Sequence, residues 1–112
     1  MSDKRYPQTP DGRYFVARGR LWRRTDPRLN AAERQHWVNQ LMAARRGVTD
    51  AADDQARRDA RRDVQTAKEA LGERGPVWWD DGAPDETRTA PRNSRYADWW
   101  AALESASRDA GS

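Results

Sequence analysis

The sequence predicts a mostly α-helical fold with a minor β part. Its expected order is a short N-terminal β-segment, an antiparallel helical hairpin, a tryptophan-anchored loop and a C-terminal helix. Two stretches with helical hydrophobic spacing in residues 30–71, an aromatic and β-branched run in residues 13–24, and two later pairs of adjacent tryptophans support this fold class.

The β-segment is predicted over residues 13–24. In one continuous strand, Phe15 and Leu21 would share a face, but Gly19 interrupts the run and is typical of a bulge or a tight hairpin. A single strand is not stable alone. We therefore expect it to pair with residues 4–9, to fold on itself, or to pair with a second subunit.

The first helix is predicted over residues 30–47. Asn30 followed by Glu33 fits the N-cap and N3 positions of a capping box. Apolar residues then recur with helical spacing on one face: Trp37, Leu41, Ala44 and Val48. Gly47, with Thr49 and Asp50 after it, is expected to end this helix and to begin the next.

The second helix is predicted over residues 51–71. One side carries small and apolar residues: Ala52, Ala56, Ala60, Val64, Ala67 and Leu71. The outer face places opposite charges at helical spacing: Asp53 with Arg57, Asp54 with Arg58, and Asp59 with Arg62. Small side chains let another helix approach closely, so the two helices are predicted to form an antiparallel hairpin.

A long loop over residues 73–93 follows, and a last helix is predicted over residues 95–104. Adjacent residues of an extended segment point to opposite faces, so Trp78 and Trp79 are expected to contact different surroundings. We favour burial of these rings in the core and keep a partner or ligand surface as the alternative. The last helix carries a spaced aromatic face: Tyr96, Trp99, Trp100 and Leu103.

Length and composition predict one small domain with a thin core. The chain has 112 residues, of which 36% are apolar and 35% charged. We expect a single compact domain over residues 13–104, a loose N-terminal arm over residues 1–12 and a frayed tail over residues 105–112. The six tryptophans are expected to supply much of the core.

The sequence gives no sign of secretion or of membrane insertion. It has no cysteine, no apolar N-terminal run typical of a signal peptide, and no apolar stretch long enough to span a bilayer. We therefore expect a cytoplasmic protein of bacterial type that has no membrane partner.

The charge is unevenly distributed, and this indicates a candidate binding surface. Residues 1–46 carry a net charge of +7 and residues 47–112 a net charge of −4, and 19 of the 21 basic residues are arginine. Guanidinium groups bind phosphate and aromatic rings stack on bases, so this segment has the composition of a nucleic-acid surface. The candidate partner or nucleic-acid residues are Arg13, Arg18, Arg20, Trp22, Arg23, Arg24, Trp78 and Trp79. The alternative is that these arginines pair with the protein's own acidic half.

Catalytic or metal-binding groups are not indicated. The acids of the loop, Asp80, Asp81, Asp85 and Glu86, do not follow a calcium-loop pattern and are expected to cap turns or to accept bonds from Arg74, Arg88 or Arg92. His36 is the single histidine and is expected on the surface. We expect no cofactor, no metal and no catalytic residue.

Several segments resemble a family of small uncharacterised bacterial proteins. They are Gly12–Val16, Arg18–Arg23, Gly72–Trp79, Asp81–Asp85 and Tyr96–Trp99, and the most specific is the loop Gly-Glu-Arg-Gly-Pro-Val-Trp-Trp at residues 72–79. Some family members are loosely labelled as Tol-type biopolymer-transport proteins. The resemblance implies no fold, activity or site residue that could be carried over.

The leading functional hypothesis is a small non-enzymatic protein-interaction module with an unknown protein partner. An accessory protein that binds nucleic acid through the arginine and aromatic segment is the alternative. A third hypothesis is a small-molecule binder or an enzyme with a cleft at the tryptophan loop. A thin core and a lone strand also favour a homodimer.

Overall fold

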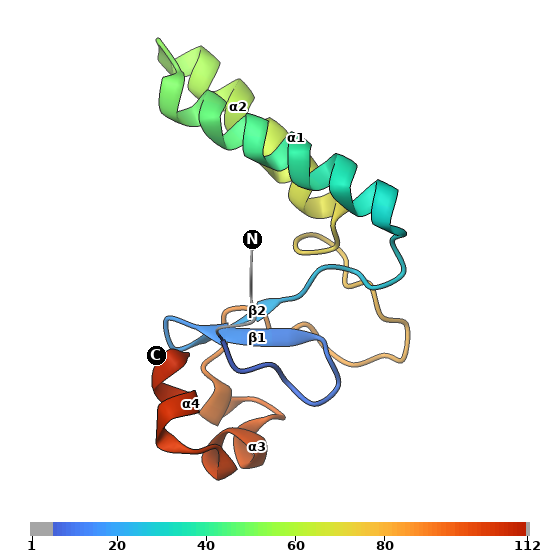
Figure 1. Cartoon of the computed structure of the whole chain (residues 1–112), viewed down its shortest axis with the longest axis vertical. Coiled ribbons are helices and arrows are strands. Elements are labelled where there is room, and N and C mark those ends of the chain that lie inside the picture. Colours follow the sequence, from blue (N-terminus) through green and yellow to red (C-terminus); the bar gives the residue numbers. More distant parts are fainter. Residues whose placement is uncertain (1–5, 112) are drawn as a thin grey trace. The chain divides into compact units, whose positions relative to one another are not determined.

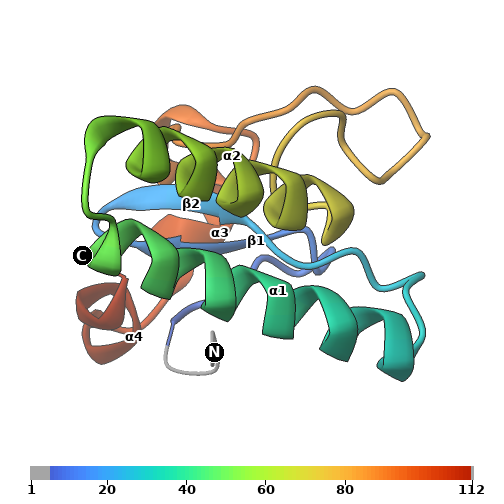
Figure 2. The same ribbon diagram turned by 90° about the horizontal axis from the view of Figure 1, so that it is seen from above.

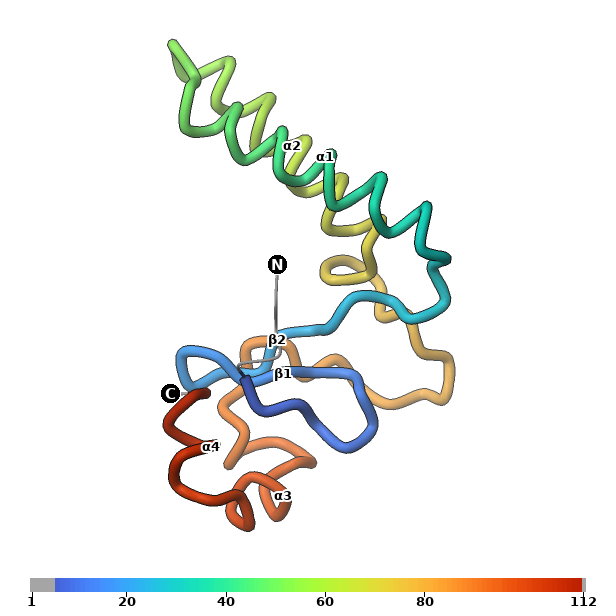
Figure 3. The backbone as a smooth tube through the Cα atoms, viewed as in Figure 1, coloured from blue at the N-terminus to red at the C-terminus, as the bar shows by residue number. Residues whose placement is uncertain are grey.

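The chain folds into two compact units in the computed structural model, which describes residues 6–111 (Figure 1). The sheet unit comprises Met1–Arg24 with Trp79–Ser112, and the helical unit comprises Thr25–Trp78. The helical unit is therefore an insertion in the sequence of the sheet unit. Figure 3 traces the chain out of the second strand into the helices and back into the loop. One domain over residues 13–104 stays a prediction.

The sheet unit is built on a tight β-hairpin. Strands β1 (Tyr14–Ala17) and β2 (Arg20–Arg23) pair antiparallel. The two residues between them both have left-handed backbones, with φ 55° at Arg18 and φ 74° at Gly19. This geometry is typical of a type I′ turn, whose twist matches that of the strands. The predicted fold-back at Gly19 is thus present.

Two further segments continue the hairpin at its edges. The Val16 N–H donates to the Pro7 carbonyl at 2.9 Å, and the Thr9 N–H donates to the Tyr14 carbonyl at 2.9 Å. At the other edge, the Leu21 N–H donates to the Thr89 carbonyl at 2.9 Å. The strand is therefore not a lone one, which removes one of the reasons for expecting a homodimer. Residues 1–5 of the predicted loose arm lie outside the described part of the chain.

The inner face of the hairpin is the core of the sheet unit. Tyr14, Val16 and Leu21 are buried on it, whereas Phe15 and Trp22 are opposite each other on the outer face. The prediction that Phe15 and Leu21 share a face is wrong. It assumed a continuous strand, and the two-residue turn reverses the chain and changes which residues share a side.

Three short helices complete the sheet unit: the 3₁₀ helix η1 (Pro91–Asn93), α3 (Ala97–Ala102) and α4 (Ser105–Ala110). The sequence predicted a frayed tail where α4 lies. A backbone contact explains this difference, because the Gly111 carbonyl accepts a hydrogen bond of 2.7 Å from the Gly19 N–H. The glycine also lies directly against Val16, so the end of the chain is attached to the hairpin.

The helical unit is an antiparallel hairpin of α1 (Ala31–Asp50) and α2 (Asp54–Ala70), which lie side by side in Figure 2. The predicted capping box is present. Asn30 accepts from the Glu33 N–H at 2.8 Å, and the Glu33 carboxylate accepts from the Asn30 N–H at 3.2 Å. Asp53 caps α2 by accepting from the Ala56 N–H at 2.7 Å. Within residues 6–111, no helix is long and apolar enough to cross a membrane.

The predicted apolar faces of the two helices form the core of the helical unit. Leu41, Ala67 and Leu71 are buried together, with Trp37 and Val64 packed against them. These residues belong to the two apolar helix faces that the sequence predicts to pack against each other. Their burial drives the helices together, since each apolar side chain removed from water contributes about 1.5–3 kcal/mol.

Gly47 has a different role from the predicted one. It lies inside α1 and does not end it, and a methyl group added there would lie 3.3 Å from the Ala60 side chain. The missing side chain thus permits close packing of the two helices.

The charged face of α2 also differs in detail from the prediction. The predicted pair of Asp59 with Arg62 is present at 3.2 Å. Arg57 pairs with Asp54 at 3.1 Å, since Asp53 is occupied as the helix cap. Exposed pairs of this kind contribute only a few tenths of a kcal/mol.

The two ends of the inserted segment are held together within the helical unit. The Asp26 N–H donates to the Leu71 carbonyl at 2.8 Å, and the Thr25 hydroxyl donates to Glu73 at 2.9 Å. Between these contacts, Gly72 has φ 79° and lies against Asp26 and the Trp78 ring. This junction requires a residue without a side chain.

We predict that Gly72→Ala destabilises the protein by about 3 kcal/mol, from backbone strain and from steric overlap. The added methyl would lie 2.8 Å from the Asp26 Cβ and 3.0 Å from Trp78. Gly82→Ala is the matched control, because Gly82 has φ 83° with open space around it, and only strain of about 1 kcal/mol is expected. Chemical denaturation followed by circular dichroism measures both losses, and equal losses would contradict the steric role of Gly72.

Candidate functional site

The structure separates the eight candidate residues. Seven of them lie in the sheet unit, and Trp78 lies in the helical unit. Trp79 is buried, and Trp78 is half-buried against Gly72. The two adjacent rings therefore have different surroundings, as the sequence analysis expected.

Arg13 is bound to the tryptophan loop of its own unit. Its guanidinium donates to the Asp81 carboxylate and lies 4.8 Å from the centre of the Trp79 ring. The hydrogen bond from Arg13 lowers the pKa of Asp81, and the same bond raises the pKa of Arg13. The Trp79 indole N–H donates to the Ala83 carbonyl at 2.8 Å, which fixes the ring. This arginine thus has a structural role in holding the loop.

Arg23 makes a second connection to the same loop. Its side chain is buried, and its guanidinium lies 3.4 Å from the Asp85 carboxylate. Burial raises the pKa of Asp85, but hydrogen bonds from Thr87 and the charge of Arg23 outweigh that effect, and the pKa is lowered. Removing one partner of such a pair leaves the other charge without compensation. Asp81 and Asp85 are therefore bound by Arg13 and Arg23, and not by the predicted Arg74, Arg88 or Arg92.

Asp11 and Tyr96 form a third connection between the two chain segments of the sheet unit. The Tyr96 hydroxyl donates to Asp11 at 2.6 Å, and the Thr9 hydroxyl donates to the same carboxylate at 2.7 Å. Burial and the bond to Asp11 raise the pKa of Tyr96. Burial raises the pKa of Asp11, but the bonds from Tyr96, Thr9 and Arg13 together lower it.

The outer face of the hairpin carries three aromatic rings, Tyr6, Phe15 and Trp22, and we define the face by them. Tyr6 stacks on Phe15 with 5.7 Å between ring centres, and Phe15 is opposite Trp22 in the strand pairing. All three rings are half-buried. Arg18 and Arg20 are exposed at the turn end of the same hairpin. This face keeps the composition that the sequence analysis associated with base stacking and phosphate contacts.

Three further residues of the candidate set donate to backbone carbonyls. The Trp22 indole N–H donates to the Ala17 carbonyl at 2.8 Å, which orients its ring. The Arg24 guanidinium donates to the Gly12 carbonyl at 3.3 Å. Arg20 donates to the Arg88 carbonyl at 2.7 Å, so Arg18 is the candidate arginine with the fewest internal constraints.

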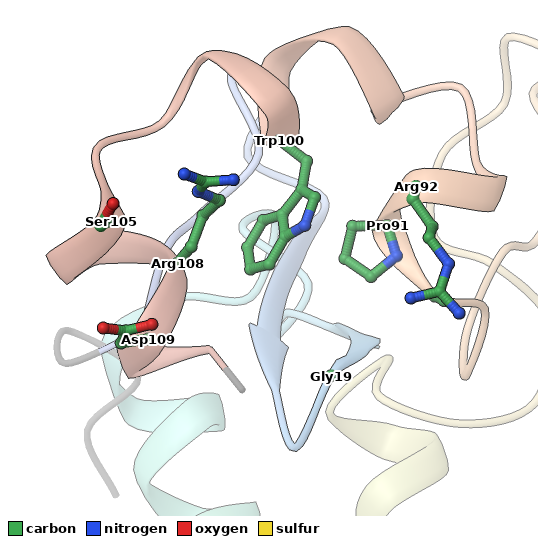
Figure 4. Close-up of a pocket in the computed structure, with 8 residues that line it drawn as sticks. Gly19, Pro91, Arg92, Trp100, Ser105, Arg108 and Asp109 are labelled. Atoms are coloured by element: carbon green, nitrogen blue, oxygen red, sulfur yellow. The ribbon is translucent and has the colours of Figure 1, made fainter.

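A pocket of about 540 Å³ lies beside the hairpin turn (Figure 4). Its lining includes Gly19, Pro91, Arg92, Trp100, Arg108 and Asp109. The Trp100 ring extends between Arg108 and Pro91, so an aromatic surface lies next to a guanidinium. Volumes of about 300–1,000 Å³ are typical of pockets that hold small molecules.

The sequence did not predict this pocket. Of its lining residues, Trp100 alone stands out in the sequence, because it belongs to an adjacent tryptophan pair. Arg92 and Arg108 gave no signal, because 19 arginines are spread over the whole chain. Their proximity depends on α4, which the sequence analysis had expected to fray.

Residues 6–111 contain no group of three or more histidine, cysteine or acidic side chains arranged to hold an ion. His36 is exposed on α1 and lies edge-on to Trp37, with 4.8 Å between ring centres.

The chain was compared with protein-family models, with curated proteins and with solved structures, and none of them matches it. The resemblance to the bacterial family therefore stays a prediction.

We predict that the stability of the protein decreases as the pH falls below 3.8, the ordinary pKa of an aspartate. Asp11 has a lowered pKa in the folded state, so its contribution is complete above the unfolded-state pKa and is lost as the pH falls through the folded-state pKa.

Urea denaturation from about pH 5 to about pH 2 measures this loss. Asp11→Asn should remove about 1 kcal/mol of stability at neutral pH and should make the further loss of stability at acidic pH smaller. Asp63→Asn, on the exposed side of α2, controls for the loss of one negative charge. If Asp11→Asn loses as much stability at acidic pH as the original chain does, this carboxylate is not coupled to folding.

Proposed function

We propose that the protein is a non-enzymatic protein-interaction module and that its sheet unit binds a short acidic segment of a partner protein. The observation that carries this proposal is the pocket beside the hairpin turn. It combines the Trp100 ring and Pro91 with the guanidinium groups of Arg92 and Arg108. The described lining contains two arginines and one carboxylate, Asp109, a composition that favours an acidic ligand.

The composition of the pocket supports recognition of a peptide. Tryptophan and arginine are the residues that most often dominate the binding energy of protein interfaces. The planar guanidinium binds a carboxylate through two parallel hydrogen bonds, and the indole ring covers an apolar side chain next to it. An acidic segment with a neighbouring apolar residue would use both features.

Selection from a phage-displayed library of random peptides tests this function. We predict that peptides enriched on the full chain contain aspartate or glutamate. They should bind Arg92→Glu at least about tenfold more weakly, since a charged hydrogen bond contributes about 1.5–3 kcal/mol. Arg92 is exposed, so the substitution should not unfold the protein.

Arg34→Glu is the matched control, because it changes the net charge equally on an exposed position of α1. Peptide affinity should be the same in this variant as in the original chain. A selection without enrichment, or enriched peptides that bind Arg92→Glu with full affinity, would reject the pocket as the binding site.

Binding of single-stranded nucleic acid is the second candidate function, and the outer face of the hairpin favours it. Three rings from neighbouring segments lie beside the exposed Arg18 and Arg20. Bases stack on such rings, and each phosphate contact makes the affinity dependent on salt.

We predict that a labelled single-stranded oligonucleotide binds with an affinity that falls as the salt concentration rises. Fluorescence anisotropy over a salt series measures the slope. Arg18→Ala should reduce that slope by about 0.7, the value expected for one phosphate contact on a single strand. Arg34→Ala should leave it unchanged. No binding at low salt, or equal slopes in the two variants, would exclude this function for the outer face.

A further inference from the structure

A second cavity lies within the helical unit and has an unusual charge. It is a groove of about 630 Å³ along α1 and α2, and we refer to it as the arginine groove. Each helix contributes an arginine, a valine and a polar residue: Arg45, Val48 and Thr49 from α1, and Arg61, Val64 and Gln65 from α2. Arg74, which follows α2, completes the lining.

The two helices present these residues with the same spacing. In both triplets the valine is three residues and the polar residue four residues after the arginine. Residues three and four apart share one face of a helix, so each helix directs the same three kinds of side chain to the groove. The result is an apolar floor of two valines flanked by guanidinium groups from both helices.

The arginines of the groove differ from their neighbours on α2. Arg57, Arg58 and Arg62 each donate to a side chain three residues earlier, at 2.9–3.2 Å. Arg45 and Arg61 are exposed and make no side-chain hydrogen bond or ion pair within residues 6–111. No acidic residue is part of the described lining. The groove therefore holds positive charge that the described part of the fold does not neutralise.

Arg74 is held in place at the groove by a neighbouring amide. Its guanidinium donates to the Gln65 side chain at 2.8 Å, and both side chains are half-buried. A guanidinium has five N–H donors, and one bond to an amide leaves most of them available. The third charge of the groove is thus fixed before any ligand arrives, which reduces the entropy lost on binding.

We propose that the arginine groove binds the phosphate group of a small organic phosphate monoester. Three guanidinium groups match the charge and the several acceptor oxygens of a phosphate dianion. Val48 and Val64 offer an apolar surface to the organic part of the ligand. This site belongs to the helical unit alone and is independent of the peptide site in the sheet unit.

Isothermal titration calorimetry of the full chain with adenosine monophosphate as the probe tests this proposal. We expect one binding site per chain, with Arg61→Gln and Arg45→Gln each weakening the affinity at least about tenfold. Arg62→Gln is the matched control. It removes the same charge from the neighbouring position, where the guanidinium already binds Asp59 at 3.2 Å, and should leave the affinity unchanged.

Two further titrations identify the source of the phosphate. Inorganic phosphate should bind more weakly than the monoester, because it leaves the two valines uncovered. A single-stranded oligonucleotide should bind with the same affinity to the original chain and to Arg61→Gln.

Specific results would overturn the proposal. They are no heat with adenosine monophosphate at millimolar concentration, equal weakening by Arg61→Gln and Arg62→Gln, or inorganic phosphate binding as tightly as the monoester. An oligonucleotide that binds more tightly than the monoester and depends on Arg61 would assign the groove to a nucleic-acid backbone instead.

Discussion

The burial of Tyr14 joins the two chain segments of the sheet unit, and the rest of that unit depends on it. The side chain is 1% exposed, with the rings of Trp79 and Tyr96 at 5.5 and 5.6 Å. Its hydroxyl accepts a hydrogen bond of 2.8 Å from the Glu86 N–H. Tyr14 thus contacts both the loop and the start of α3. Its burial raises the pKa of its hydroxyl group.

Paired charges supplement a core that contains few apolar residues. The basic segment that precedes the helices supplies Arg13 and Arg23, and the acidic segment that follows them supplies Asp81 and Asp85. The uneven charge of the sequence is therefore partly complementarity within the fold. It also explains why arginine content alone is a weak guide to binding. An arginine such as Arg61 is more informative, because its neighbours Arg57 and Arg62 form ion pairs whereas Arg61 forms none with the residues that the structure describes.

Local patterns made the helical unit predictable, whereas the sheet unit depends on contacts distant in sequence. The capping box at Asn30 and the apolar stripes of α1 and α2 involve residues a few positions apart, so the sequence shows them directly. The position of α4 and the pocket depend on Gly19 meeting Gly111 and on residues 7–9 and 88–89 pairing with the hairpin. No local pattern predicts those meetings. The arginine partners of the acidic loop could not be chosen from the sequence, because it offers 19 candidates.

The closed ends of the helical insertion affect the order in which the chain folds. The sheet unit must bring its two chain segments together, and residues 25–78 separate them. Helices with local contacts form in microseconds, and the bonds from Thr25 to Glu73 and from Asp26 to Leu71 then close the long loop. Joining the two segments of the sheet unit then closes an effective loop of only a few residues. This shorter loop lowers the entropic cost of closure by about 1–2 kcal/mol. Formation of the helical hairpin thus shortens the conformational search that brings the aromatic residues of the sheet unit together.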